Sequence, residues 1–172
     1  MVSGPGAGAV LLTGVYGTGK SSVGAELAYL LQERGERFAL LDLDFLGWAA
    51  TRQPGRSYGF QLMLANLRAV LTNYAQAGVD WYVLAYFVRD GGELAALRDA
   101  VAVPLSVIRL EVPVEEISRR LAADVTTERQ DDLRVAAASV AAGEGVGLED
   151  LLVSNNRPVS VVAREVLAFL GW

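Results

Sequence analysis

The sequence of 172 residues contains no cysteine and no histidine, and it has a single lysine, Lys20. A chain without cysteine forms no disulfide and offers no thiolate nucleophile. Without either residue type it also lacks zinc sites of the usual kind and imidazole acid–base chemistry. Any catalysis must therefore use carboxylates, hydroxyls, arginine, the one lysine, backbone amides and a hard cation that prefers oxygen ligands.

Long apolar runs and an excess of positive charge are also lacking. No stretch approaches the roughly 20 apolar residues that span a bilayer, and residues 1–8 lack the charged start of a secretory signal. The formal net charge of -5 and the pI of about 4.8 give no positive field for a nucleic acid backbone. We therefore expect a cytoplasmic protein with a flexible segment 1–8 and no nucleic acid or membrane partner.

The remaining composition is that of one globular domain spanning residues 1–172, with 52% hydrophobic and 20% charged residues. Short apolar runs alternate with longer amphipathic stretches, which favours a parallel sheet covered by helices on both faces. The predicted strands are Ala9–Thr13, Phe38–Asp42, Tyr82–Val88, Ser106–Val112 and Leu151–Ser154. The predicted helices are Lys20–Glu33, Gln61–Gln76, Gly92–Val101, Pro113–Asp124, Leu133–Ala142 and Val159–Leu170. Two segments are expected to be irregular, namely Phe45–Gly59 and a lid near Val125–Asp132.

A phosphate-binding motif lies between the first predicted strand and the first predicted helix. Residues 14–21 match G-x-x-x-x-G-K-[ST], and the glycines allow several backbone N–H groups to converge on one phosphate. The alternative, a fortuitous glycine-rich turn, is disfavoured by this context and by the placement of the only lysine. We predict that Lys20 contacts the β- and γ-phosphates of ATP and that Ser21 binds Mg²⁺. The nucleotide-binding candidates here are Gly14, Tyr16, Gly17, Thr18, Gly19, Lys20, Ser21 and Ser22.

Two aspartates, Asp42 and Asp44, follow the second predicted strand and are the only acidic residues between Glu36 and Asp80. A spacing of two places both carboxylates on one face if the strand continues, and ligands of such sheets bind beyond the carboxyl ends of strands. One aspartate is expected to hold Mg²⁺ through water and the other to orient or deprotonate an acceptor hydroxyl. The sequence does not decide which aspartate has which role, and we assign Asp42 to the metal. The alternative is a solvated strand end or a helix cap.

The order of these features resembles the P-loop small-molecule kinases, the group of adenylylsulfate, gluconate, shikimate and nucleotide kinases. Residues 41–44, Leu-Asp-Leu-Asp, are similar to the L-D-x-D of adenylylsulfate kinases. The third predicted strand ends without an aspartate, which favours a small kinase over motor, transporter and switch ATPases. The resemblance implies a three-layer α/β/α fold with five parallel strands in the order 2-3-1-4-5, a short lid bearing arginines, and phosphoryl transfer from ATP.

Further candidates come from the same resemblance. Asn66 and Arg68 match an Asn-x-Arg of the adenylylsulfate kinases, and Arg89 matches an arginine after the third strand, so all three become acceptor candidates. The segment Asn155-Asn156-Arg157-Pro158, after the last strand, corresponds in position to a loop that borders adenine. The nucleotide candidates implied in this way are Asn156, Arg157 and Pro158, together with Arg120 before the lid.

Arginines also gather around the predicted lid. Arg129 and Arg134 are our candidates for neutralising charge on the transferring phosphoryl group, together with Arg119 and Arg120 nearby. The alternative is that these arginines only form surface pairs with the neighbouring residues Glu128, Asp131 and Asp132.

An aromatic-rich segment follows the two aspartates. Phe45 and Trp48, with Tyr58 and Phe60, are predicted to wall an acceptor pocket that favours a flat or apolar group, and the alternative is that they are core residues. Arg52 and Arg56 are candidates for binding an acceptor anion.

Taken together, these features predict an ATP-dependent phosphotransferase that acts on a small-molecule acceptor with Mg²⁺, as a monomer or homodimer. One alternative is a nucleotide-binding regulator or slow ATPase with a protein partner. A binding module without catalysis is disfavoured by the complete triplet Gly19-Lys20-Ser21.

Overall fold

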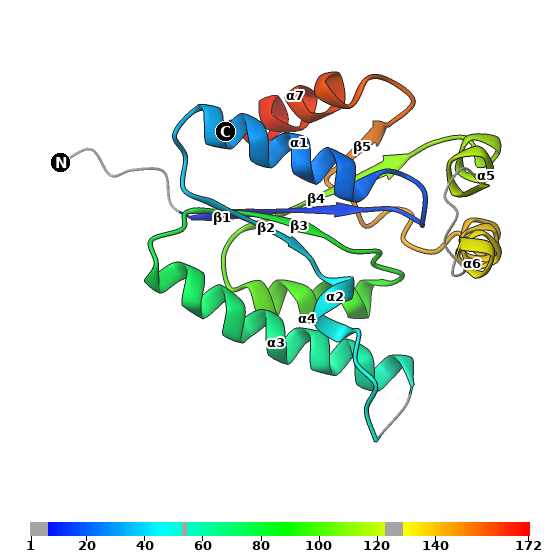
Figure 1. The fold of residues 1–172 in the computed structure, drawn as a ribbon, viewed down its shortest axis with the longest axis horizontal. Coiled ribbons are helices and arrows are strands. Elements are labelled where there is room, and N and C mark those ends of the chain that lie inside the picture. Colours follow the sequence, from blue (N-terminus) through cyan, green and yellow to red (C-terminus); the bar gives the residue numbers. More distant parts are fainter. Residues whose placement is uncertain (1–6, 53–54, 123–128) are drawn as a thin grey trace.

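The computed structural model describes residues 7–52, 55–122 and 129–172 and shows a parallel sheet between two layers of helices (Figure 1). The strands are β1 (Gly8–Thr13), β2 (Phe38–Asp42), β3 (Trp81–Ala85), β4 (Leu105–Glu111) and β5 (Leu151–Ser154). The helices are α1 (Lys20–Glu33), α2 (Asp44–Gly47), α3 (Arg56–Gln76), α4 (Gly91–Val101), α5 (Val114–Ala122), α6 (Arg129–Ala141) and α7 (Val159–Leu170). The strand order β2-β3-β1-β4-β5 confirms the predicted fold class.

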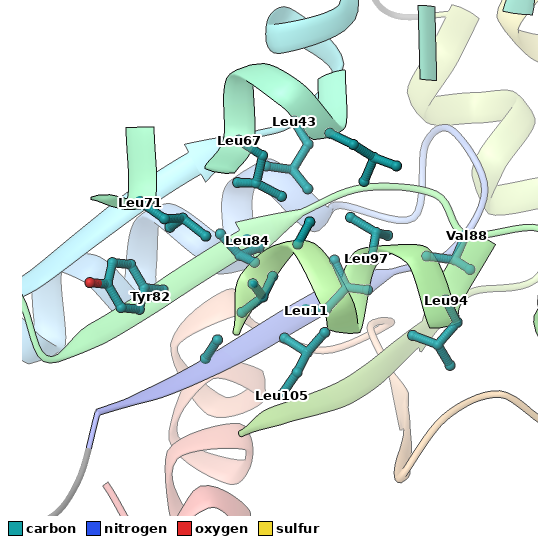
Figure 2. Close-up of a cluster of buried hydrophobic side chains, with 14 of the residues drawn as sticks. Leu11, Leu43, Leu67, Leu71, Tyr82, Leu84, Val88, Leu94, Leu97 and Leu105 are labelled. Atoms are coloured by element: carbon teal, nitrogen blue, oxygen red, sulfur yellow. The ribbon is translucent and has the colours of Figure 1, made fainter. Parts of the chain in front are cut away.

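The central strand β1 shows how the sheet is buried on both faces. Its residues alternate, so that Ala9 and Leu11 pack with α3 and α4 while Val10 and Leu12 pack with α1 and α7. Figure 2 shows Leu11 and Leu84 of the sheet beside Leu67 of α3 and Leu97 of α4. Because strands buried on both faces need apolar residues at every position, the continuous apolar runs in the sequence identify them correctly.

The segment after β2 contains more helix than the sequence predicts. The short helix α2 occupies Asp44–Gly47, and α3 begins at Arg56, about one turn before the predicted Gln61. The two helices meet at a pair of glycines, since a Cβ on Gly47 would lie 2.9 Å from the carbonyl oxygen of Gly59. Close packing of this kind depends on tertiary contact, and a local pattern of polar and apolar residues does not reveal it.

Other boundaries also differ from the prediction. Strand β3 ends at Ala85, before the predicted Val88, because the N–H of Val88 donates to the Thr13 hydroxyl oxygen at 3.1 Å and no longer joins the ladder. Strand β4 runs one residue earlier than predicted, and α6 begins at Arg129, so the second half of the predicted lid is helical. Residues 125–128 of that lid and residues 1–6 lie outside the described residues. Among the described helices, none combines the length and apolar character needed to cross a bilayer.

Candidate functional site

The loop between β1 and α1 has the conformation that its glycines allow. Gly14, Gly17 and Gly19 have φ angles of 133°, 83° and 92°, a region that other residues rarely adopt. There is also no room for side chains, since a Cβ on Gly14 would lie 2.5 Å from the carbonyl oxygen of Leu110, and one on Gly19 2.5 Å from Nδ2 of Asn155. Both the backbone conformation and the packing therefore require glycine at positions 14 and 19.

Polar contacts within this loop hold it closed around its own backbone. The Thr18 hydroxyl donates to the carbonyl oxygen of Val15 at 2.8 Å, and the Thr18 N–H donates to the same oxygen at 3.3 Å. The buried ammonium of Lys20 donates to the carbonyl oxygens of Gly14 at 2.8 Å and Val15 at 3.2 Å. The positive charge thus lies across the loop, beside the start of α1, whose first-turn N–H groups form a local anion-binding region.

Ser21 and Asp42 form the next part of the site. The Ser21 hydroxyl, in the first turn of α1, donates to Oδ2 of Asp42 at the end of β2, with a distance of 3.0 Å. The other carboxylate oxygen, Oδ1, accepts from the N–H of Asp44 at 3.3 Å. Hydroxyl and carboxylate oxygens are ligands that fit Mg²⁺. Among the described residues no cluster of three or more acidic side chains forms a metal site, so a cation here would also need phosphate oxygens and water.

A cleft of about 1240 Å³ joins these groups at the carboxyl ends of the strands. The structure brings to it most of the predicted residues, from the phosphate loop, from the aspartate segment and from the arginines. The predicted residues that line the cleft are Tyr16, Gly17, Gly19, Lys20, Ser21, Ser22, Asp42, Asp44, Phe45, Trp48, Arg56, Phe60, Arg89 and Arg120. Thr18 and Gly14 belong to the same loop but line a second hollow of about 500 Å³ behind it.

The half of the cleft away from the phosphate loop has aromatic walls. Phe45 and Trp48 stack with ring centroids 5.9 Å apart and are 67% and 69% exposed, which is unusual for side chains of this size. Phe60 and Tyr86 also line the cleft and stack with ring centroids 6.2 Å apart. Burial raises the pKa of Tyr86 to about 12, with smaller contributions from the nearby carboxylates Glu93 and Asp44. The Tyr86 phenol therefore stays protonated near neutral pH and can donate a hydrogen bond.

Two arginines on this side carry ion-pair partners. Nε of Arg89 lies 3.3 Å from Oε2 of Glu144, and its guanidinium carbon lies 5.6 Å from the ring centroid of Phe87. Arg56 pairs with Glu93, which also accepts from the N–H of Arg89 at 3.0 Å. The cleft lining thus includes two arginines that pair with acidic residues outside that lining.

The structure does not bring every predicted residue to the cleft. Asn66 donates to the carbonyl oxygen of Leu46 at 2.8 Å, and Arg68 pairs with Asp99 at 2.9 Å on the outer surface of α3 and α4. Both lie farther along α3 than its cleft-lining residues, and a helix advances about 1.5 Å per residue, so Arg68 lies beyond the part of α3 that lines the cleft. The exposed Arg52 does not line the cleft either.

The predicted adenine loop, residues 155–158, lies only partly in the cleft. Asn156 and Pro158 are exposed, Arg157 pairs with Glu165 at 2.6 Å, and none of the three lines the cleft. The neighbouring Asn155 does line it and is 1% exposed. Asn155 belongs to the predicted segment 155–158 but is not among the candidates Asn156, Arg157 and Pro158, although its position directly after the last strand is a signal that a parallel sheet gives for ligand-contacting residues.

The predicted catalytic arginines lie on or before α6. Arg134 is exposed on α6 and does not line the cleft, while the side chain of Arg129, the first residue of α6, lies outside the described residues. Arg120 contacts the phosphate loop directly, since Nη1 donates to the carbonyl oxygen of Gly17 at 3.4 Å. Arg119 instead pairs with Glu116 at 2.7 Å and is largely exposed.

Comparison with known proteins agrees with this geometry. No protein-family model and no curated protein sequence matches the chain. Solved structures match over almost its whole length. A sugar kinase from Janibacter sp. HTCC2649 gives a TM-score of 0.70 at 19% identity, covering 97% of this chain and 95% of that one. A gluconokinase from Sinorhizobium meliloti gives 0.66 at 20% identity, covering 97% and 92%.

A third similar structure is the APS kinase CysC of Mycobacterium tuberculosis, solved in complex with AMPPNP and APS. It gives a TM-score of 0.61 at 21% identity, with coverage of 98% of this chain and 100% of that chain. The chain therefore has the fold of the P-loop small-molecule kinases, and the resemblance inferred from the sequence is confirmed at the level of the fold.

Proposed function

We propose that the protein is an ATP-dependent phosphotransferase that moves the γ-phosphate to a hydroxyl of a small-molecule acceptor. The observation that carries this proposal is the pairing of Ser21 with Asp42 at 3.0 Å beside Lys20, in a cleft whose other half is lined by Asp44 and aromatic side chains. The similar sugar kinase, gluconokinase and APS kinase structures support a kinase over a regulator.

The phosphate loop forms the nucleotide half of the proposed site. Backbone N–H groups of residues 17–21 and the start of α1 bind the phosphates, and Lys20 exchanges the carbonyl oxygens of Gly14 and Val15 for phosphate oxygens. Ser21 would hold Mg²⁺ directly and Asp42 through water, and the bound ion would neutralise part of the phosphate charge. Arg120 borders this half from α5.

Asp44 is the residue proposed to handle the acceptor proton. The acceptor oxygen attacks the γ-phosphorus, the bond from that phosphorus to the bridging oxygen breaks, and ADP leaves with the electron pair. The hydroxyl proton passes to the Asp44 carboxylate and then to solvent. Arg129 and Arg134 of α6 are kept as the candidates that neutralise charge during this step.

The aromatic half of the cleft supports an acceptor with a flat or apolar body. The exposed stack of Phe45 and Trp48 offers a platform for a ring, and the protonated phenol of Tyr86 offers a hydrogen bond. Arg56 and Arg89 can contact an anionic group of the acceptor. Adenylylsulfate is one candidate acceptor, and nucleosides and sugars are others. We further propose that the protein works in the cytoplasm as a monomer or homodimer, with no nucleic acid or membrane partner.

The proposal is tested by incubating the pure protein with ATP, Mg²⁺ and a panel of acceptors while ADP release is followed. The panel contains adenylylsulfate, nucleosides, nucleotides, sugars and aminoglycoside-like antibiotics. We expect acceptor-dependent turnover that is lost in Lys20→Ala and Asp44→Ala and kept in Asp99→Ala, whose carboxylate is exposed and remote from the cleft. Slow hydrolysis that no acceptor accelerates would favour the regulator instead.

A further inference from the structure

Asn155 is a buried polar residue that connects the end of the sheet to the phosphate loop. It follows β5 directly and is 1% exposed, and its own N–H donates to the carbonyl oxygen of Glu111 in β4 at 2.8 Å. Its side-chain Nδ2 donates to the carbonyl oxygen of Thr18 at 2.7 Å. A primary amide buried to this degree is costly unless it is hydrogen-bonded, so the bond to Thr18 specifies where Asn155 points.

This bond also sets the orientation of the next peptide N–H. In a planar trans peptide the C=O and the N–H point in opposite directions. With the Thr18 carbonyl turned toward Asn155, the N–H of Gly19 is turned to the opposite side. Gly19 itself lines the cleft. Its backbone is left-handed, and Nδ2 of Asn155 occupies the space that a Cβ on Gly19 would need. The glycine and the asparagine are therefore complementary in shape as well as hydrogen-bonded through Thr18.

Arg120 completes the arrangement from α5. Nη2 donates to the backbone oxygen of Asn155 at 2.9 Å, and Nη1 donates to the carbonyl oxygen of Gly17 at 3.4 Å. Oε1 of Glu116 lies 2.6 Å from Nε of Arg120. Hydrogen bonds from Arg120 and Arg119 lower the pKa of the Glu116 carboxyl. We call Asn155 and Arg120 together the carbonyl clasp, because they bind the carbonyl oxygens of two successive loop residues, Gly17 and Thr18.

We infer that Asn155 is a positioning residue for nucleotide phosphates, acting through the Thr18 carbonyl to present the Gly19 N–H to the cleft. The inference rests on the proposed nucleotide function of the loop. It goes beyond that function because Asn155 acts on phosphate affinity without touching the reacting atoms. The role requires a hydrogen-bond donor, so an isosteric acceptor in its place opposes the Thr18 carbonyl and turns the peptide.

The test uses Asn155→Asp, with Asn156→Asp as the matched control. Both substitutions change one amide to one carboxylate in adjacent positions, but Asn156 is exposed and does not line the cleft. Calorimetry measures the affinities for ATP with Mg²⁺ and for inorganic tripolyphosphate. We expect Asn155→Asp to weaken both by at least about tenfold and Asn156→Asp to change both by less than about twofold.

A second variant, Asn155→Ala, removes the donor without adding charge, and we expect a loss of affinity intermediate between the wild type and Asn155→Asp. It also covers the case in which Asn155→Asp does not fold. Affinities of the folded Asn155 variants within about twofold of the wild type would overturn the inference. A wild-type protein that binds both ligands but phosphorylates no acceptor would contradict the kinase proposal and leave the role of Asn155 standing. A wild type that binds neither ligand overturns both.

Discussion

Arg89 and Glu144 come from distant parts of the sequence, and Nε of Arg89 lies 3.3 Å from Oε2 of Glu144. Glu144 also accepts from the Ser139 hydroxyl at 2.7 Å, and the next residue, Gly145, donates its N–H to the carbonyl oxygen of Arg89 at 2.8 Å. The turn after α6 is thus connected to the loop that carries the cleft-lining Arg89.

A double-mutant cycle on this pair measures how strongly it is coupled. We expect Arg89→Gln and Glu144→Gln to show a coupling of about 1 kcal/mol in urea unfolding, since both side chains are partly buried. The pair Arg68–Asp99 serves as the control, because its side chains are 48% and 78% exposed, and its coupling should be near zero. Equal coupling in the two pairs would contradict the structural role given to Glu144.

Substitution of Gly19 separates backbone strain from steric exclusion. Gly19→Ala introduces both a left-handed alanine and a Cβ only 2.5 Å from Nδ2 of Asn155. Gly35→Ala is the matched control, because Gly35 has a φ of 72° and a Cβ added there would meet no atom within 4 Å. Strain alone costs about 1 to 2 kcal/mol, so Gly35→Ala should lose this much in the free energy of unfolding.

Gly19→Ala should lose more, and it should also bind ATP at least about tenfold more weakly, as measured by calorimetry. The added loss comes from the clash that displaces Asn155 and the Thr18 carbonyl. Identical stability losses in the two variants, with ATP affinity retained in Gly19→Ala, would show that the space beside Asn155 is less restricted than the structure indicates.

Tyr86 gives the protein a pH dependence at the alkaline end. Its pKa of about 12 exceeds the ordinary value of 10.0, so the folded state keeps the phenol proton after the unfolded chain has lost it. The stabilisation is therefore complete below pH 10 and falls as the pH rises from about 10 to 12. Urea unfolding across this range should show a smaller alkaline loss in Tyr86→Phe than in the wild type. Tyr74→Phe is the control, and a loss that is unchanged in Tyr86→Phe would argue against the burial of this phenol.

Asp42 is expected to act on nucleotide affinity only when the cation is present. Asp42→Asn removes the charge opposite Ser21, so the gain in ATP affinity on adding Mg²⁺ should fall by about tenfold, while ATP binding without Mg²⁺ should change little or improve. Calorimetric titrations with and without Mg²⁺ check this, with Asp99→Asn as the control. A uniform change in both titrations would indicate that Asp42 supports the loop and does not serve the metal.

The sequence predicts the sheet and the phosphate loop well because both depend on local chemistry. Strands buried on both faces are continuous apolar runs, and the loop needs glycine at positions that no other residue tolerates. The strand order comes from the family resemblance. The sequence misses the start of α3 because it depends on the approach of Gly47 to Gly59, which are far apart in the helical pattern.

The same distinction between local pattern and tertiary contact explains which residues of the candidate site are predicted. Ser21 and Asp42 are predicted as metal ligands from separate segments, and the structure places them in contact. Asn66 and Arg68 are inferred by matching a short motif, but the length of α3 carries Arg68 to the outer surface. Asn155 lies in the segment matched to the adenine loop, but its hydrogen bond to Thr18, 137 residues away in the chain, does not follow from a local sequence pattern.

The role proposed for Asn155 would couple the edge strand β5 to nucleotide binding through the carbonyl clasp. Strand β5 has only four residues and pairs with β4 alone, so its amide protons should exchange with deuterium sooner than those of the central β1. Asn155 connects the end of β5 to Thr18 by a hydrogen bond. Coupling between two sites is reciprocal, so nucleotide binding that orders Thr18 should also slow amide exchange in β5. The exchange rate of the β5 amides would then report whether the cleft is occupied, although β5 carries none of the reacting groups.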